Sequence, residues 1–508
     1  MLPRMSSSVQ SNSPKDAPTT VGGILSSLGP GLVVAGAIVG SGELIATTVC
    51  GAEAGFWLLW LIILGCLIKV FVQVELARFV MVSGQTSLAA LSGVPGPRVG
   101  RLNWLVLFWL IMFLFSVGQL GGIVGGVGQA LQIAVPLSES GDMYNRLVEA
   151  KTSAMVSLAQ GTGSESAAEL DSLTNQVQAL KGTVMDHYVW AALVAVLTAG
   201  LLVWGRYGFI EGFATTLVAG FTLMTVINLA LLQSHGEWAI GWADLSRGLS
   251  FRLPPATSGL DPLATALATF GIIGVGAGEL VFYPYWCQEK GYARFVGPND
   301  GSEAWYRRAE GWLRVLRWDA FCSMVVYTTS TVAFYLLGAA VLHRVGMKPQ
   351  GMELISTLVV MYRPVFGDWA VGILLVGAFA VLYSTFFVTN ASKARLAADA
   401  VRVLGWRRDS AESGRKALVF FSAFFPLACF VVYACFSKPT QLILAAGFTQ
   451  ALLLPMLSGA ALYFRYCRTD PRLAPGKLWD ALLWLSALGM LLAGSWLALS
   501  RVFPGLRA

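Results

Sequence analysis

The amino-acid sequence predicts an all-α integral membrane protein, and three observations carry this prediction. Of the 508 residues, 56% are apolar and only 12% are charged, which is more apolar surface than one or two water-soluble domains bury. Windows of about 20 residues almost without charge recur along the chain, and each is long enough to cross roughly 30 Å of hydrocarbon as a helix. Two similar glycine-rich motifs, GSGEL and GAGEL, interrupt two of these windows.

Segmentation of the apolar windows gives about eleven transmembrane helices. Their approximate ranges are 24–50, 55–80, 102–135, 187–205, 209–232, 262–287, 318–342, 368–396, 416–436, 439–463 and 478–500. The first 20 residues are polar and lack the apolar stretch of a signal peptide. We therefore expect residues 1–23 to form a disordered cytoplasmic tail.

The distribution of basic residues indicates the orientation in the membrane. In a membrane protein, a net charge of +7 reports topology rather than binding of nucleic acid. A cytoplasmic N-terminus puts most of the 35 Lys and Arg residues on inner segments, chiefly the loops 288–317 and 393–416. We expect the N-terminus in the cytoplasm and the C-terminus outside, with the chain in the lipid bilayer of a plasma membrane, the inner membrane if the source is bacterial.

One long polar insertion, 136–186, falls outside the membrane in this arrangement. Four apolar residues in its second half lie at helical spacing; they are Leu170, Leu173, Val177 and Leu180. The insertion is expected to be a helical hairpin over the outer mouth of the protein.

The two glycine-rich motifs form an internal repeat. They lie at Gly40–Leu44 in the first span and at Gly276–Leu280 in the sixth. An odd number of spans separates them, so the second copy crosses the membrane in the opposite direction, as inverted repeats do. Each glycine weakens a helix by about 1 kcal/mol relative to alanine, and we expect both helices to be broken here. The predicted units are 24–232 (first repeat), 233–463 (second repeat) and 464–508 (an inner loop and the eleventh span).

This organisation is typical of a secondary transporter that works by alternating access as a monomer. A channel more often shows rings of pore-lining residues from an oligomer. A membrane-embedded enzyme is the least expected of the three classes, because no nucleophile motif or cluster of metal ligands occurs. The seven cysteines form no CxxC pair, so we expect no resident cofactor and no disulfide framework.

Several stretches resemble the Nramp group of metal-ion transporters: Gly29–Gly31, Gly51–Trp60, Val74–Thr86 and Gly271–Pro284. The resemblance implies a LeuT-type fold, built from two inverted repeats of about five spans each with the first and sixth helices broken. The binding motifs depart from the group. Gly40 stands at its metal-binding aspartate, Glu43 at its asparagine, and Gly278 and Leu280 at its methionine and histidine. The ligands for manganese or iron are therefore missing.

Two substrates remain open for the altered site, and we favour the first, a bicarbonate-like anion, narrowly over the second, a hard divalent cation. Helix breaks expose backbone N–H groups and the positive end of a dipole, which favours a small anion such as bicarbonate. Glu43 and Glu279 instead favour Mg²⁺ or another hard divalent cation, unless both only complement helix dipoles. The predicted substrate-binding residues are Gly40, Ser41, Gly42, Glu43, Thr47, Gly276, Ala277, Gly278, Glu279, Tyr283 and Gln450.

The coupling ion is expected to be sodium or a proton. Ser384 and Thr385 are adjacent hydroxyl residues in the eighth span, and they resemble the position at which sodium-coupled relatives of this fold bind Na⁺. The alternative is that both hydroxyls bond back to their own helix. Lys69, in the second span, is an intramembrane charge of the kind that is usually functional, and we expect it to be a buried counter-charge to a glutamate.

Overall fold

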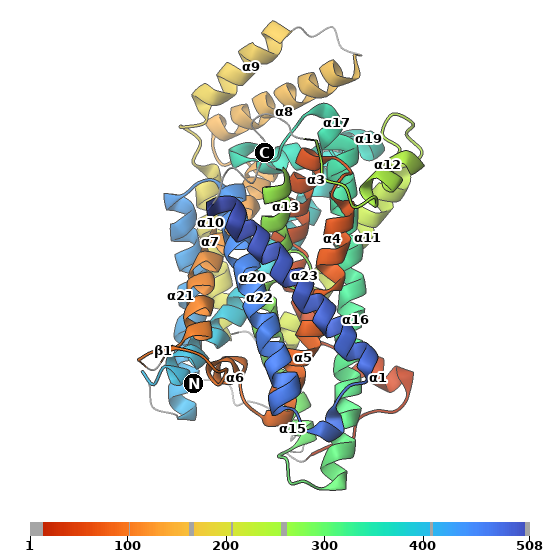
Figure 1. Ribbon diagram of the computed structural model, residues 1–508. Coiled ribbons are helices and arrows are strands. Elements are labelled where there is room, and N and C mark those ends of the chain that lie inside the picture. The colour runs from red at the N-terminus through yellow and green to blue at the C-terminus, as the bar shows by residue number, and fades with distance from the viewer. Residues whose placement is uncertain are drawn as a thin grey trace.

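The computed structural model describes residues 14–100, 102–161, 167–204, 207–255, 262–406 and 410–502. It is a bundle of long helices, shown from the side in Figure 1. Among the described residues, nine helices are long and apolar enough to cross a membrane. The prediction of an all-α, multi-pass membrane protein is confirmed.

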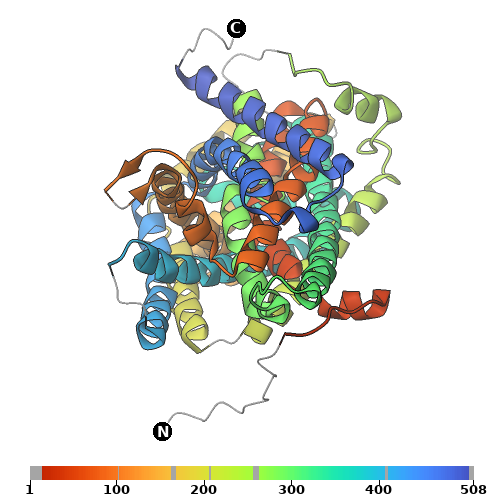
Figure 2. The same cartoon turned by 60° about the horizontal axis from the view of Figure 1, so that its bottom comes forward.

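The first half of the bundle follows the predicted spans closely. It consists of α2 (Pro30–Ile38) with the π-helical η1 (Ser41–Thr47) and α3 (Thr48–Ala54), then α4 (Leu59–Leu67) with α5 (Lys69–Ser83), α7 (Trp104–Ala134), α10 (Asp186–Trp204) and α11 (Tyr207–Leu232). The first span begins at Pro30 rather than at 24, because a separate helix, α1 (Val21–Ser27), precedes it. In Figure 2, α1 projects from the edge of the bundle.

The second half begins with the other broken span, α13 (Pro262–Phe270) and α14 (Ala277–Lys290), whose two pieces contain 9 and 14 residues. It continues with α16 (Glu303–Leu337), η2 (Gly338–Leu342) and α17 (His343–Val345), then α20 (Ala370–Val403), α21 (Ala411–Cys435), α22 (Pro439–Tyr463) with η5 (Phe464–Arg468), and α23 (Lys477–Val502). The tilted α23 crosses the outside of the bundle (Figure 1).

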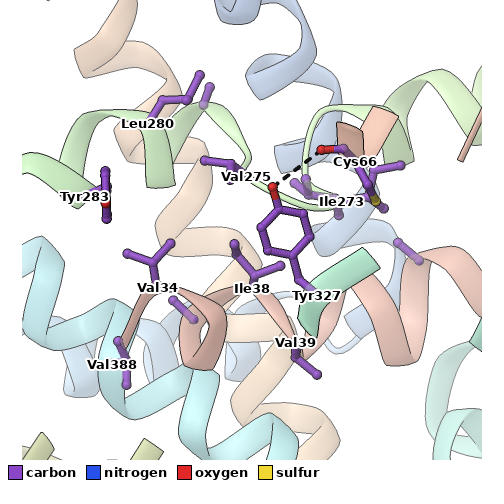
Figure 3. Close-up of a cluster of buried hydrophobic side chains, with 14 of the residues drawn as sticks. Val34, Ile38, Val39, Cys66, Ile273, Val275, Leu280, Tyr283, Tyr327 and Val388 are labelled. Carbon is purple, nitrogen blue, oxygen red and sulfur yellow. Dashed lines mark hydrogen bonds between the residues drawn. The ribbon is translucent and has the colours of Figure 1, made fainter. Parts of the chain in front are cut away.

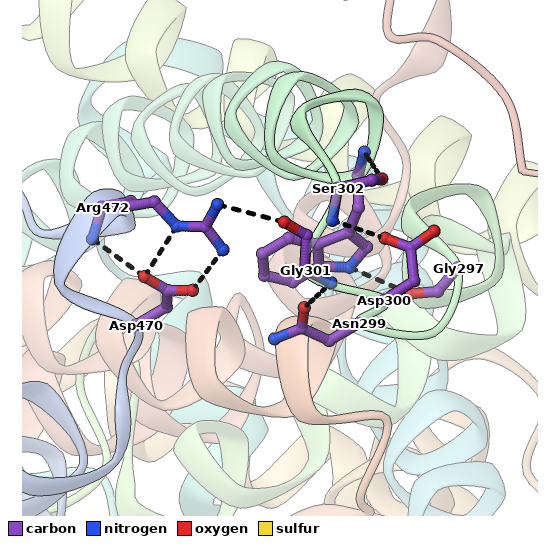
Figure 4. A network of polar contacts seen from close by, with 8 residues as sticks. Gly297, Asn299, Asp300, Gly301, Ser302, Asp470 and Arg472 are labelled. Carbon is purple, nitrogen blue, oxygen red and sulfur yellow. Dashed lines mark hydrogen bonds and ion pairs between the residues drawn. The ribbon is translucent and has the colours of Figure 1, made fainter.

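Short elements connect these spans. They are α6 (Ser87–Ser92), α12 (Trp242–Gly248), α15 (Tyr292–Val296), α18 (Leu354–Val359), α19 (Arg363–Phe366), η3 (Gly351–Glu353), η4 (Gly367–Trp369) and η6 (Pro471–Leu473), with the antiparallel strands β1 (Arg98–Val99) and β2 (Leu102–Asn103). Arg472, the middle residue of η6, pairs with Asp470 and donates to the carbonyl oxygen of Gly301 at 3.4 Å (Figure 4). These contacts fasten the chain before α23 to the loop before α16.

The insertion is a helical hairpin, as its spacing predicts. Its arms are α8 (Glu139–Gln160) and α9 (Ala167–Leu180), and they cover one end of the bundle in Figure 1; we call this the hairpin end. Lys151 pairs with Glu353 at 2.8 Å, and Arg363 pairs with Glu149 at 3.0 Å. Residues 162–166, between the two arms, lie outside the described residues.

Close packing around α7 depends on its glycines. A Cβ atom on Gly122 would lie 2.7 Å from the carbonyl oxygen of Pro439, and one on Gly128 would lie 2.3 Å from that of His187. Small residues let helices approach closely inside a membrane. They bring α7 against both α22 and α10.

The predicted tail is attached to the bundle where the structure describes it. Residues 1–13 lie outside the described residues. The N–H of Lys15 donates to the carbonyl oxygen of Phe295 at 2.9 Å, and the Trp312 indole donates to the carbonyl oxygen of Lys15 at 2.7 Å. The segment next to α1 is therefore held at the end opposite the hairpin.

The start of α2 depends on one buried carboxylate. Asp319 accepts hydrogen bonds from the N–H groups of Gly29 and Gly31, at 2.9 and 2.6 Å, and from the Tyr283 hydroxyl at 2.8 Å. These N–H groups have no partner inside their own helix, so the carboxylate caps the span.

We predict that Asp319→Ala lowers the free energy of unfolding by about 2–4 kcal/mol, because it leaves two buried N–H groups without an acceptor. Tyr283→Phe is the matched control, since it removes only the hydroxyl bond. Thermal unfolding of the purified protein in detergent measures both variants. An equal loss in both would contradict the capping role of Asp319.

Candidate functional site

The break in the first span is short. The α-helix α2 ends at Ile38, and Gly40 is neither helical nor extended, with φ −173° and ψ −107°. A Cβ atom on Gly40 would lie 1.9 Å from the Thr385 hydroxyl oxygen. Only glycine lets α20 approach the break this closely.

The break in the sixth span is longer, from Gly271 to Gly276. Gly274 has a φ of +54°, a left-handed conformation that glycine adopts without strain. A Cβ atom on Gly271 would lie 2.0 Å from the carbonyl oxygen of Gly447, so α22 packs directly on the break. Gly276 precedes α14, and Glu279 lies in the first turn of that helix.

Glu43 connects the two breaks. Its side chain is completely buried. One carboxylate oxygen accepts from the N–H of Gly40 at 3.4 Å, while the other accepts from the N–H of Gly274 at 3.3 Å and from the Thr331 hydroxyl at 3.1 Å. Such bonds stabilise a carboxylate away from water. Glu43 therefore complements the broken backbone of both spans.

Lys69 reaches the sixth-span break from α5. Its ammonium group donates to the carbonyl oxygens of Phe270 and of Ile273, the latter at 2.8 Å, and lies 4.5 Å from the centre of the Phe270 ring. Phe270 ends α13, so a cation sits at the negative end of that helix. The expected counter-charge is present, but its direct partners are carbonyl oxygens.

A chain of side-chain hydrogen bonds joins the two breaks on another side. The Gln119 amide donates to the Ser41 hydroxyl at 3.0 Å, the Gln450 amide donates to the Gln119 carbonyl at 2.9 Å, and the N–H of Gly278 donates to the Gln450 carbonyl at 3.2 Å. We call Ser41, Gln119 and Gln450 the glutamine bridge. Gln119 was missing from the predicted set, although a polar side chain in an uncharged span is itself a signal of function.

Glu279 lies beside this bridge. One of its carboxylate oxygens is 2.6 Å, and the Gln450 carbonyl oxygen 2.8 Å, from the point that a Cβ atom of Gly276 would occupy. The structure thus gathers a carboxylate oxygen and an amide oxygen in the space that this glycine leaves.

Three of the other predicted residues lie near the breaks. Ala277 is the first residue of α14, a Cβ atom on Gly42 would lie 3.0 Å from the carbonyl oxygen of Ile272, and the Thr47 hydroxyl donates to the carbonyl of Glu43, in its own helix. Tyr283 is elsewhere, because its hydroxyl donates to Asp319 at the start of α2.

The hydroxyl pair of the eighth span reaches the first-span break. Thr385 donates to the carbonyl oxygens of Gly36 and Val39, at 3.1 and 3.3 Å. Ser384 donates to Val381 of its own helix at 2.9 Å and is 3.4 Å from the carbonyl oxygen of Gly36. The structure contains a feature of each interpretation. Thr385 and Ser384 both reach carbonyl oxygens released by the break, and Ser384 also bonds back to its own helix.

A second buried lysine corrects the sequence analysis, which placed Lys393 in an inner loop. In the structure α20 continues to Val403, and Lys393 lies within it with 4% of its surface exposed. Its ammonium group donates to the Ser116 hydroxyl and lies 4.6 Å from the centre of the Phe113 ring. Lys69 and Lys393 both act electrostatically on Glu279.

Apolar side chains enclose the breaks. Figure 3 shows Val34, Ile38, Val275 and Leu280 around this region, with the Tyr327 hydroxyl bonded to the carbonyl oxygen of Cys66. In the described part of the chain, no three His, Cys, Asp or Glu side chains gather closely enough to hold a metal ion. A ligand here would meet hydroxyl, amide and backbone groups beside one or two carboxylates.

Two large cavities lie away from the breaks. One, of about 1360 Å³, opens at the hairpin end, and we call it the vestibule; its lining includes Lys151, Lys181, Lys348 and Lys438. The other, of about 1010 Å³, is lined by residues at the opposite end, including Arg294 and Arg468. Neither is lined by Glu43 or Glu279, so both cavities end short of these two carboxylates.

Comparison with known proteins relates this arrangement to a family. The sequence model described as natural resistance-associated macrophage protein-like, Nramp, matches residues 146–500. The matched range contains the sixth-span motif and excludes the first-span motif. No curated protein matches the sequence.

Solved structures share the fold. A mutant of the Eremococcus coleocola manganese transporter superposes with a TM-score of 0.59 at 15% identity, covering 97% of this chain and 91% of that one. The same transporter bound to an aromatic bis-isothiourea compound gives 0.57 at 13% identity, covering 98% and 92%. Mhp1, a nucleobase-cation-symport-1 family transporter, gives 0.52 at 13% identity, covering 97% and 96%.

We predict that Gly40→Ala lowers the thermal unfolding midpoint strongly, because its Cβ atom would overlap the Thr385 hydroxyl oxygen. Gly278→Ala is the matched control, since its Cβ atom would meet only the Gln450 carbonyl oxygen at an ordinary 3.6 Å. Similar midpoints for the two variants would contradict the close approach of α20 to the first-span break.

Proposed function

The chain belongs to the Nramp-like family, and we propose that it is a secondary transporter that carries a hard divalent cation, such as Mg²⁺, between its two broken spans. The observation that carries this proposal is the glutamine bridge beside Glu279. It offers hydroxyl, amide and carboxylate oxygens, which are the ligands that hard divalent cations prefer. The similarity in fold to the manganese transporter of Eremococcus coleocola supports the same class of substrate.

The two glutamates have different roles in this proposal. Glu279 is the charged ligand of the cation, together with oxygens of Ser41, Gln119 and Gln450. Glu43 holds the breaks together, because its carboxylate accepts hydrogen bonds from backbone N–H groups of both broken spans. A single carboxylate gives a site that binds and also releases its ion, as a carrier requires.

The inverted repeat supports alternating access by one chain. The distribution of basic residues predicts that the N-terminus lies in the cytoplasm. The sequence predicts sodium or a proton as the coupling ion, with Ser384 and Thr385 as the candidate sodium ligands. This assignment stays a prediction.

A second candidate, transport of a bicarbonate-like anion, rests on the basic residues around the path. Lys69 and Lys393 lie close enough to act on Glu279, and Lys151, Lys181 and Lys348 are among the lysines that line the vestibule. Four lysines outnumber the two glutamates of this lining, Glu53 and Glu353, and an entrance with excess positive charge attracts anions and repels cations. The comparisons give this candidate no support.

Uptake into liposomes tests the proposal. We expect Mg²⁺ to enter vesicles that contain the protein, reported by a Mg²⁺-sensitive dye inside them, and ¹⁴C-bicarbonate to stay at the level of empty vesicles. Accumulation of bicarbonate without entry of Mg²⁺ or Mn²⁺ would establish the anion candidate instead. Vesicles that take up none of the three would contradict both.

We predict that Glu279→Gln weakens Mg²⁺ binding by more than about tenfold, because it removes the charged ligand. Glu43→Gln should leave the affinity nearly unchanged and lower the thermal midpoint, since its amide NH₂ cannot accept the bond that the carboxylate accepts. Titration calorimetry on the purified variants measures the affinities. Loss of binding in Glu43→Gln alone would reverse the two roles.

A further inference from the structure

One peptide group in the sixth-span break lies between two buried charges. The carbonyl oxygen of Ile273 accepts from the Lys69 ammonium at 2.8 Å, and the N–H of the next residue, Gly274, donates to the Glu43 carboxylate at 3.3 Å. These two groups belong to the same peptide bond. Both charged side chains are completely buried, and they come from different spans.

Lys69 also takes the place that a free cation would need. A broken helix releases carbonyl oxygens at membrane depth, and transporters use such oxygens to coordinate coupling cations. In the sixth span, the carbonyls of Phe270 and Ile273 bind the Lys69 ammonium instead. The cation at this break is therefore part of the chain.

The carbonyl oxygens that the break in the first span leaves without helical partners also accept hydrogen bonds from the chain. The Thr385 hydroxyl donates to both Gly36 and Val39. For a sodium ion to bind there, Thr385 would have to turn its proton away from these oxygens, because a cation needs the lone pairs of the hydroxyl. Thr385 thus satisfies this break without an ion.

We propose that Lys69 is a built-in cation that replaces a diffusible coupling cation, so that the transport cycle and the folded state are independent of sodium. A tethered ammonium supplies the positive charge that the end of α13 requires. It also supplies the charge opposite Glu43. This inference rests on the proposed function only in taking the protein to be a carrier.

Truncation of Lys69 in the purified full-length protein tests the proposal. The thermal midpoint is measured in choline chloride, sodium chloride and methylammonium chloride at equal ionic strength. Wild-type midpoints should be the same in all three. Lys69→Ala should unfold at a lower temperature in choline, and sodium or methylammonium should restore much of the loss by filling the vacated position.

Two further variants separate charge from general destabilisation. Lys69→Arg keeps a cation and should remain insensitive to sodium. Lys416→Ala, at an exposed lysine that pairs with Glu412 of its own helix at 2.6 Å, should behave as wild type. If Lys69→Ala does not fold, the arginine variant and the wild type still decide the outcome.

Transport provides the second measurement. Uptake of Mg²⁺ by wild-type protein in liposomes should be equal in sodium and in choline. A wild type that requires sodium, for stability or for uptake, overturns the proposal, as does a Lys69→Ala variant indistinguishable from wild type in choline. If the thermal midpoints behave as predicted but Mg²⁺ does not enter the liposomes, the proposed substrate is wrong and the role of Lys69 stands. The midpoints do not depend on which ion is carried.

Discussion

The peptide group between Ile273 and Gly274 is the point on which the centre of the protein depends. A buried ammonium from the second span holds its carbonyl, and a buried carboxylate from the first span holds its N–H. Each charge is tolerable in the membrane only because it has partners there. Loss of either would leave the other side of the break unsatisfied, at the cost of several kcal/mol that accompanies an uncompensated buried charge. The first, second and sixth spans are thereby joined at one peptide group.

The same constraint explains the rest of the polar interior. Irregular backbone at membrane depth is stable only where protein groups or water satisfy it. The Thr385 hydroxyl does this for the first break, and Gln450 does it for the N–H of Gly278 at the start of α14. Because these bonds run between different spans, opening a path to either cavity requires some of them to separate. The hydrogen bonds that close the site are therefore also the ones that must break and re-form during a transport cycle.

The sequence could locate the breaks but not their partners. Glycine pairs inside an apolar window weaken a helix wherever it packs, so GSGEL and GAGEL identify both breaks from local information. The hairpin arms were predictable for the same reason, since helical spacing is local. The direction in which the Tyr283 side chain points could not be predicted. Its partner Asp319 lies in a different span, and only packing brings the two residues together. Lys393 was misplaced because α20 continues beyond its apolar window, and no composition rule marks where a partly buried helix leaves the membrane.

Charge balance at the breaks explains why Glu279, rather than Glu43, suits a transported ion. Glu43 and Lys69 hold opposite ends of one peptide group, so their charges compensate each other through a fixed part of the backbone. Lys393 is directed to Ser116 and Phe113 of α7 and acts on Glu279 only at longer range. Glu279 therefore sits beside the glutamine bridge, while the direct hydrogen-bond partners of both lysines are other groups. A cation that lost its water here would find one strong ligand and several neutral oxygens, a combination that favours binding without preventing release.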